Sequence, residues 1–276
     1  MINEDVNNNK DNNDNNKYDK YLKILEKLRP IDDNFMRAMF KDNIPLGQFV
    51  LRIILNKKDL ILTKLETQYD GKRVTGARSL CLDVYACDKD NKKYDLEIQR
   101  EDKGASPKRA RYHSSVVDIE NLNVNDEFDD LIGTSIIFIC ENDIYGKGEP
   151  IYSFNRVDTC NGIIFNDECN ILYVNGKYRQ DDDLGRLMHD FNCNKADDMY
   201  YDIMKETTRY LKETKEGVQQ MCKILEEFVE EENAKVEARF ASLMQRLFSL
   251  DRIEDAKRAS VDSKYREQLL KEFSLV

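Results

Sequence analysis

Two acidic residues, Asp83 and Glu97, lie in two short runs whose composition is typical of the arms of a β-hairpin. Each run alternates apolar and polar residues, and the polar cluster DKDNK between them predicts a turn. Side chains along a strand point alternately to its two faces. A turn centred on Asp90 therefore pairs Tyr85 with Asp95 and Asp83 with Glu97, so the carboxylates of Asp83 and Glu97 are expected on one face.

Opposed carboxylates destabilise a sheet unless water, a basic neighbour or a divalent cation offsets their repulsion. Mg²⁺ prefers oxygen ligands and commonly takes one or two carboxylates together with phosphate oxygens and waters. Gln99 lies on the face of Glu97 and can bind a water or a phosphate oxygen, but it carries no charge. The alternative is a hairpin whose outer face is simply charged and solvated, which is the ordinary antiparallel pattern.

A basic helix is predicted to follow the hairpin, with Ser106 as its N-cap and Pro107 at its first position. Arg109 lies in its first turn. Four further side chains are spaced to share one face: Lys108, Arg111, Tyr112 and Ser115. Guanidinium groups bind phosphate oxygens in a bidentate manner, and a helix N-terminus adds free N–H groups. The alternative is a basic helix face that is only solvated.

Composition limits the class of protein. The chain has 276 residues, 35% of them charged, and a net charge of −10. This acidic balance does not favour nucleic acid, although local basic patches decide phosphate binding. The sequence has no apolar run of membrane-spanning length and no signal-peptide core, so we expect no membrane partner. Seven cysteines without a C-x-x-C pair suit a reduced cytoplasmic protein, and two histidines are too few for a His-rich zinc centre.

The pattern along the chain predicts three regions. Residues 1–17 form an Asn/Asp-rich tail that is expected to be disordered. Residues 18–195 mix helical and strand patterns and are expected to form the main domain, and residues 196–276 a helical region. Helices are predicted at 18–28, from Asp32-Asp33 through Phe40, at 46–55, after Ser106, and at 184–191, 199–211 and 216–250. Strands are predicted at 60–69, in the hairpin, and at 135–140, 151–156, 162–165 and 171–174, with turns at Asp70-Gly71 and Gly76.

The long helix at 216–250 carries one apolar stripe opposite a highly acidic face. Two interpretations stay open: the stripe packs on the domain, or it forms a homodimer contact. The apolar positions do not repeat as a sustained heptad, so a long coiled coil is not expected.

Several motifs in order resemble the PD-(D/E)XK nuclease superfamily, and more narrowly its nuclease family transposases, or recombination-promoting nucleases. The matching segments span roughly residues 30–230 and are DDNFMRAMF, RSLCLDVYACDKDNKKYDLEIQR, KRARYHSS, FICENDIYGKGEPIYSF, LGRLMHDFNC and EGVQQMCKILEE. The resemblance implies an α/β fold with a restriction-endonuclease-like core, a mixed sheet flanked by helices. It also implies Mg²⁺-dependent cleavage of DNA, with Mn²⁺ as a substitute.

Carried over by position, the resemblance makes Asp83 the first catalytic acid and Glu97 the second. The carbonyl of Ile98 is expected to add a metal ligand, and Asp33, with Asp32 beside it as the alternative, to add the acid from the first helix. Gln99 stands where the superfamily usually has lysine and is expected to orient the attacking water. The expected DNA-binding residues are Lys108, Arg109, Arg111 and Tyr112.

Loss of an oxyanion stabiliser costs about 3–4 kcal/mol in catalysis, so the change from lysine to Gln99 predicts slow cleavage or another source of charge. Two further functions remain as alternatives. One is a DNA-binding or interaction protein of a mobile element, built on a weakened nuclease core. The other is a structural protein in which Asp83 and Glu97 are merely solvated.

Overall fold

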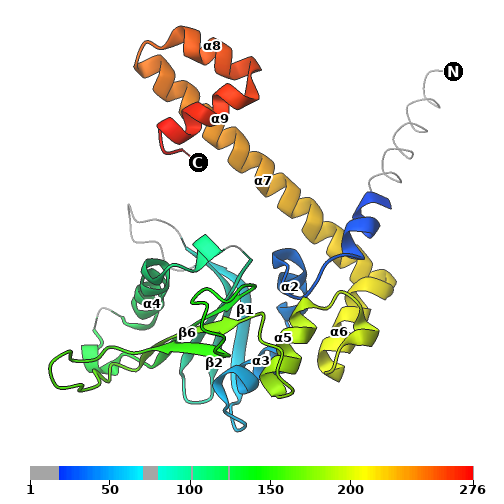
Figure 1. The fold of residues 1–276 in the computed structure, drawn as a ribbon, viewed down its shortest axis with the longest axis vertical. Coiled ribbons are helices and arrows are strands. Elements are labelled where there is room, and N and C mark those ends of the chain that lie inside the picture. Colours follow the sequence, from blue (N-terminus) through cyan, green and yellow to red (C-terminus); the bar gives the residue numbers. More distant parts are fainter. Residues whose placement is uncertain (1–18, 71–79, 101, 124, 276) are drawn as a thin grey trace. The chain divides into compact units, whose positions relative to one another are not determined.

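The computed structural model describes residues 19–70, 80–100, 102–123 and 125–275 (Figure 1). The predicted tail at 1–17 and the predicted turns at Gly71 and Gly76 lie outside these residues. Within the described part, six strands form one mixed sheet in the order β1-β2-β3-β4-β6-β5. The predicted α/β class, with a mixed sheet flanked by helices and a helical C-terminal region, is confirmed.

The sheet combines an antiparallel half with a parallel centre. Pairing is antiparallel for β1–β2, β2–β3 and β5–β6, and parallel for β3–β4 and β4–β6. The strands are β1 (Leu62–Asp70), β2 (Cys81–Asp88), β3 (Lys93–Gln99), β4 (Thr134–Cys140), β5 (Ile151–Phe154) and β6 (Cys169–Asn175). The helices are α2 (Asp33–Phe40), α3 (Ile44–Leu55), α4 (Pro107–Asn121), α5 (Asp183–Asn192), α6 (Asp202–Glu213), α7 (Lys215–Ser249), α8 (Ile253–Val261) and α9 (Ser263–Glu272).

Both faces of the sheet are buried. Phe138 and Ile136 of β4 join one apolar cluster with Ala110 and Val117 of α4. Ile137, on the opposite face of β4, is also fully buried. Helices α2 and α3 contact β1, and α2 also contacts β2. Helix α4 therefore covers one face of the sheet as the chain crosses from β3 to its parallel neighbour β4.

The predicted hairpin is confirmed in its register, because Tyr85 pairs with Asp95. Its turn is organised by one buried carboxylate. Asp88 accepts hydrogen bonds from the backbone N–H groups of Asp90 and Lys92 and from the hydroxyl of Tyr94, at 2.9, 2.9 and 2.7 Å. These bonds hold the turn at the end of β2 and keep β3 in register.

The interpretation of a solvated outer face is wrong. Parallel pairing places Asp95 beside Ile136 and Glu97 beside Phe138, on the face that packs under α4. Asp95 is 1% exposed and Glu97 is 0% exposed. The polar alternation of β3 thus marks a buried polar site, because a helix covers the face that an isolated hairpin would leave to water.

The strand predicted at 162–165 is also wrong. That segment makes one isolated bridge, between Val157 and Ile164, and its apolar residues Ile163 and Phe165 are exposed. Strand propensity is present, but the segment lies in the connection between β5 and β6 and has no continuous partner strand.

The predicted long C-terminal helix is confirmed as α7. The chain divides into two compact units, one ending at Cys222 and the other beginning at Lys223. In the second unit, residues of α7, α8 and α9 form a separate buried cluster: Leu243, Leu247, Ala256, Ala259 and Leu269. No described helix is both long and apolar enough to cross a bilayer. A homodimer contact through α7 stays a prediction.

The Asp88 turn gives a stability prediction. Asp88→Ala removes the acceptor of three hydrogen bonds and leaves the buried Tyr94 hydroxyl without a partner, so we expect a loss of about 2–4 kcal/mol in the free energy of unfolding. Urea denaturation measures it. The exposed neighbour substitution Asp90→Ala is the control, with an expected change within about 0.5 kcal/mol. Equal effects of the two substitutions would contradict this role of Asp88.

Candidate functional site

The carboxylates of Asp83 and Glu97 link the two hairpin strands. Backbone pairing of β2 with β3 runs to Val84 opposite Leu96. Beyond that pair, the N–H of Asp83 donates to Glu97 Oε1 at 2.9 Å, and the N–H of Ile98 donates to Asp83 Oδ2 at 3.1 Å. Each carboxylate is thus held by the backbone of the opposite strand, which fixes both groups on one face as their register predicts.

Burial makes both acids hard to ionise. Burial raises the pKa of Glu97 well above its ordinary value, and the charges of Asp95 and Asp83 add to the effect. Burial also raises the pKa of Asp83 to about 6, against the lowering effect of the Ile98 N–H. The charge of Asp33 raises the pKa of Asp83 further. The raised pKa values of both acids therefore come first from burial and then from the neighbouring carboxylates.

Arg109 supplies the positive charge at this site. Its Nη2 lies 2.7 Å from Glu97 Oε2, and its Nη1 lies 3.1 Å from Gln99 Oε1. Nη1 also donates to the carbonyl of Gly104, and Nε donates to His113 Nε2, both at 3.1 Å. The Arg109 side chain remains 36% exposed although Glu97 is fully buried. The Arg109 side chain therefore contacts both the buried Glu97 carboxylate and solvent.

Gly104 allows the turn before α4 to lie close to Gln99. It lies in a short 3-10 turn, Asp102–Ala105, between β3 and α4. A Cβ at this position would overlap with Gln99 Oε1. The absence of a side chain lets the turn pass directly over Gln99, so the first turn of α4 brings Arg109 onto the strand.

Behind Arg109 lies a fully buried pair, His113 and Asp95. Arg109 Nε–H donates to His113 Nε2, so the imidazole proton is assigned to Nδ1, which donates to Asp95 Oδ2 at 2.7 Å. Burial lowers the pKa of His113, in keeping with this neutral form. Asp95 Oδ1 is buried and has no hydrogen-bond partner among the described residues. The pair forms a support that orients the guanidinium of Arg109.

Sequence reasoning missed His113 and Asp95 as members of the site. His113 follows Arg109 by four residues and so shares its helix face, and Asp95 precedes Glu97 by two and shares its strand face. Both signals are visible in the sequence. The count of two histidines argues against a zinc centre, but it says nothing about a histidine that supports an arginine.

The remaining residues expected on α4 lie on its outer surface. Lys108 and Arg111 are exposed and Tyr112 is half-buried, whereas Ala110 and His113 face the sheet. The structure therefore separates Arg109, inside the site, from the basic surface formed by Lys108 and Arg111.

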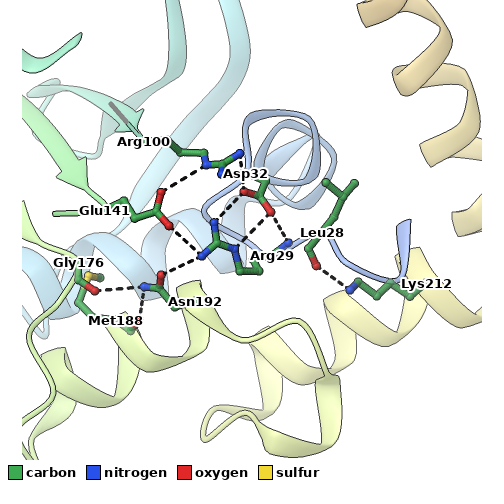
Figure 2. A network of polar contacts seen from close by, with 9 residues as sticks. All are labelled: Leu28, Arg29, Asp32, Arg100, Glu141, Gly176, Met188, Asn192 and Lys212. Atoms are coloured by element: carbon green, nitrogen blue, oxygen red, sulfur yellow. Dashed lines mark hydrogen bonds and ion pairs between the residues drawn. The ribbon is translucent and has the colours of Figure 1, made fainter. Parts of the chain in front are cut away.

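The two acids expected from the start of α2 have different surroundings. Asp32 is buried and pairs with Arg29 and Arg100, each at 3.1 Å (Figure 2). Asp33, the first residue of α2, is exposed, and its charge acts on Asp83. Asp33 is accordingly the acid of α2 that is electrostatically coupled to the site.

Two sets of residues could hold a metal ion. Asp83, which is partly exposed, and the buried Glu97 offer carboxylate oxygens, the ligand type that suits a hard cation. Asp95, Glu97 and His113 offer atoms that all lie within 4.8 Å of one another. Both nitrogens of His113 already have partners, Asp95 and Arg109. The oxygen set therefore fits a metal that also binds a substrate, and the histidine set fits a structural support.

No known protein family, no curated protein and no solved structure matches this chain in the comparisons. The resemblance of its motifs to the PD-(D/E)XK superfamily therefore stays a prediction.

The raised pKa of Asp83 predicts a pH-dependent effect on stability. Between about pH 4 and pH 6 the folded state binds more protons at Asp83 than the unfolded state, so ionisation of Asp83 destabilises the fold as pH rises. Asp83→Asn keeps an acceptor for the Ile98 N–H without the charge. In EDTA we expect it to stabilise the protein by about 2–3 kcal/mol more at pH 7.5 than at pH 4.

Urea denaturation at the two pH values measures this difference. Asp59→Asn, at an exposed position, is the control for removal of one carboxylate. A stabilisation by Asp83→Asn that does not grow with pH would contradict the assignment.

Proposed function

We propose that this protein is a metal-dependent DNA endonuclease of PD-(D/E)XK type that acts in DNA recombination or transposition. One observation carries the proposal. Asp83, Glu97 and Gln99 lie on one face of a hairpin, and Arg109 donates to both Glu97 and Gln99. This arrangement combines oxygen ligands for a cation, an amide for a water molecule and a guanidinium for a phosphate.

The site residues suit Mg²⁺ or Mn²⁺. Asp83 and Glu97 would hold the ion, together with the carbonyl of Ile98 and, through water, Asp33. When bound, the ion would lower the pKa of a coordinated water and stabilise negative charge on the phosphate. The clustering of acids whose pKa values are raised supports a cation at this position, because a positive charge would relieve their repulsion.

The protein's own residues have distinct roles in this hypothesis. Gln99 orients the attacking water through its amide. Arg109 binds a phosphate oxygen and provides the charge that the superfamily obtains from lysine, since its Nη1 is 3.1 Å from Gln99 Oε1. Asp95 and His113 keep the guanidinium in place. Lys108 and Arg111, exposed on α4, would contact the DNA backbone.

The fold is compatible with the proposal. The resemblance implies acids on a hairpin that is followed by a basic helix, within a mixed sheet flanked by helices, and β2, β3 and α4 follow this order. Among the described residues no disulfide links the cysteines, which supports the inference of a cytoplasmic protein.

The alternative is a protein of a mobile element that binds DNA but does not cleave it. The observation that favours it is the pairing of Glu97 Oε2 with Arg109 and of Glu97 Oε1 with the Asp83 N–H, which leaves fewer lone pairs for a metal. Salt-sensitive DNA binding without product, at every Mg²⁺ concentration, would support this alternative.

The first functional prediction concerns metal binding. We expect purified protein to cut DNA with Mg²⁺ or Mn²⁺, and Asp83→Asn and Glu97→Gln to abolish both cutting and Mn²⁺ binding measured by calorimetry. His113→Gln removes only a support and is expected to weaken Mn²⁺ binding by roughly tenfold.

The reverse pattern, with binding lost in His113→Gln and retained in Asp83→Asn, would assign the metal to the buried histidine set. Intact DNA after incubation of the wild type with either ion would contradict the proposed activity.

The second functional prediction concerns the source of positive charge. Arg109→Ala is expected to lower kcat by about 10²–10³-fold, as loss of one donor to a transition state does. Adding Gln99→Lys to that variant returns a cation to the site and should recover at least part of the loss. Gln99→Lys alone places two cations together, since Arg109 already contacts Gln99, and should reduce kcat.

Single-turnover cleavage measures these rates, and circular dichroism checks the fold of each variant. A wild-type rate in Arg109→Ala would contradict the role of Arg109.

A further inference from the structure

A basic pocket of about 410 Å³ opens beside the start of α2. Its wall comes from residues 19–25, which are helical, and from the turn that follows them. Arg100, directly after β3, also lines the pocket together with Arg29 and Asp32, and we call these three residues its floor. Figure 2 shows their side chains. The three lysines of its wall are Lys20, Lys23 and Lys27.

The charge of this pocket is opposite to that of the whole chain. Five basic side chains and one acidic side chain line it, whereas the net charge of the chain is −10. The two arginines are already compensated by Asp32 and Glu141. The three lysines are exposed and form no ion pair with any residue that the structure describes. The excess positive charge of the pocket therefore belongs to the lysines.

Ion pairs hold the two arginines of the floor. Arg29 Nη1 lies 2.9 Å from Glu141 Oε1, and Arg100 contacts both Asp32 and Glu141. Figure 2 shows that both guanidinium groups contact the carboxylates of Asp32 and Glu141, and that Asn192 is bonded to Arg29. The Arg100 side chain is still 52% exposed. It can bind an anion in the pocket without giving up its ion pairs, since a guanidinium has five N–H donors.

The pocket is connected to the candidate site along two segments of the chain. Arg100 is the residue after Gln99, and Asp32, in the floor, is the residue before Asp33. The charge of Asp33 acts on Asp83. Two residues that line the pocket are thus direct chain neighbours of residues expected in the candidate site.

We propose that this pocket binds backbone phosphates of the DNA strand that flanks the cleaved phosphodiester. The proposal rests on the proposed nuclease function. Lys20, Lys23 and Lys27 succeed one another at about one helical turn each, so they extend over about 10 Å. That length corresponds to about three nucleotides at 3.4 Å per strand.

The chemistry of the lining favours phosphate over base. No aromatic side chain is among the described residues that line the pocket, so it has no surface on which a base could stack. Ammonium groups on flexible stems bind phosphates as point charges and do not distinguish sequences. The pocket would therefore position the DNA strand without recognising its base sequence.

The test compares the wild type with the triple variant Lys20→Gln, Lys23→Gln, Lys27→Gln. Binding of a fluorescent DNA oligonucleotide is measured by anisotropy in EDTA over a series of salt concentrations. We expect weaker binding, with the slope of log K against log salt reduced by roughly 2–3, at about 0.9 per lost phosphate contact. All three positions are exposed, and circular dichroism checks the fold.

A matched triple, Lys57→Gln, Lys58→Gln, Lys89→Gln, removes the same charge near the other end of β3. These lysines are also exposed, and the backbone of Lys89 bonds to Ile61 beside the hairpin turn. We expect this control to keep the wild-type slope. Equal slopes for the wild type and the pocket triple, or equal losses in the two triples, would overturn the proposal.

Inorganic phosphate alone is titrated as a separate arm. Lysine-dependent binding of phosphate that displaces the oligonucleotide more strongly than chloride of equal ionic strength would assign the pocket to a free anion and overturn the DNA proposal. The assay contains no metal, so it is independent of cleavage. Lysine-dependent DNA binding by a protein that cuts nothing would support the pocket and reject the nuclease, whereas cleavage with unchanged slopes would reject the pocket alone.

Discussion

The ion pair between Arg109 and Glu97 joins the helix that covers the sheet to the strand that carries the acidic site. Glu97 has no exposure to solvent, so an unpaired charge there would be strongly unfavourable. Arg109 lies 2.7 Å from it. Removing one partner of such a pair typically costs about 3–5 kcal/mol, because the other charge stays buried. The position of α4 on the sheet, the turn over Gln99 and the register of β2 with β3 are all consistent with this contact.

The ion pair between Arg109 and Glu97 also explains why the polar pair of His113 and Asp95 lies behind Arg109. Arg109 has four partners, and two of them, Glu97 and His113, are fully buried. His113 is held in turn by Asp95. A guanidinium fixed at this many points loses little freedom when it binds a phosphate, which is the condition for an effective electrostatic contribution to catalysis. The buried pair is therefore an expected support of the proposed chemistry.

Acidic and basic side chains gather at different places in this protein. Acids gather under α4, and basic side chains gather at the wall of the pocket beside α2, although the chain as a whole carries a net charge of −10. A local positive field close to an acidic site is what a polyanionic substrate requires, since the acidic surface elsewhere repels it. The total charge does not favour nucleic acid, and the proposed DNA contact depends on the local basic pocket.

Sequence patterns are sufficient to predict the local features: the hairpin, its register with Tyr85 opposite Asp95, the N-cap of α4 at Ser106, and the long helix α7. These depend on alternation, turn composition and caps, which act between near neighbours. Tertiary structure decided that the polar face of β3 is buried and that Arg109 and His113 face it. The buried side of α4 is formed by Ala110, His113, Ser114 and Val117, which make no apolar stripe. In this orientation Arg109 Nη2 lies 2.7 Å from Glu97 Oε2, a contact between two elements that no local pattern records.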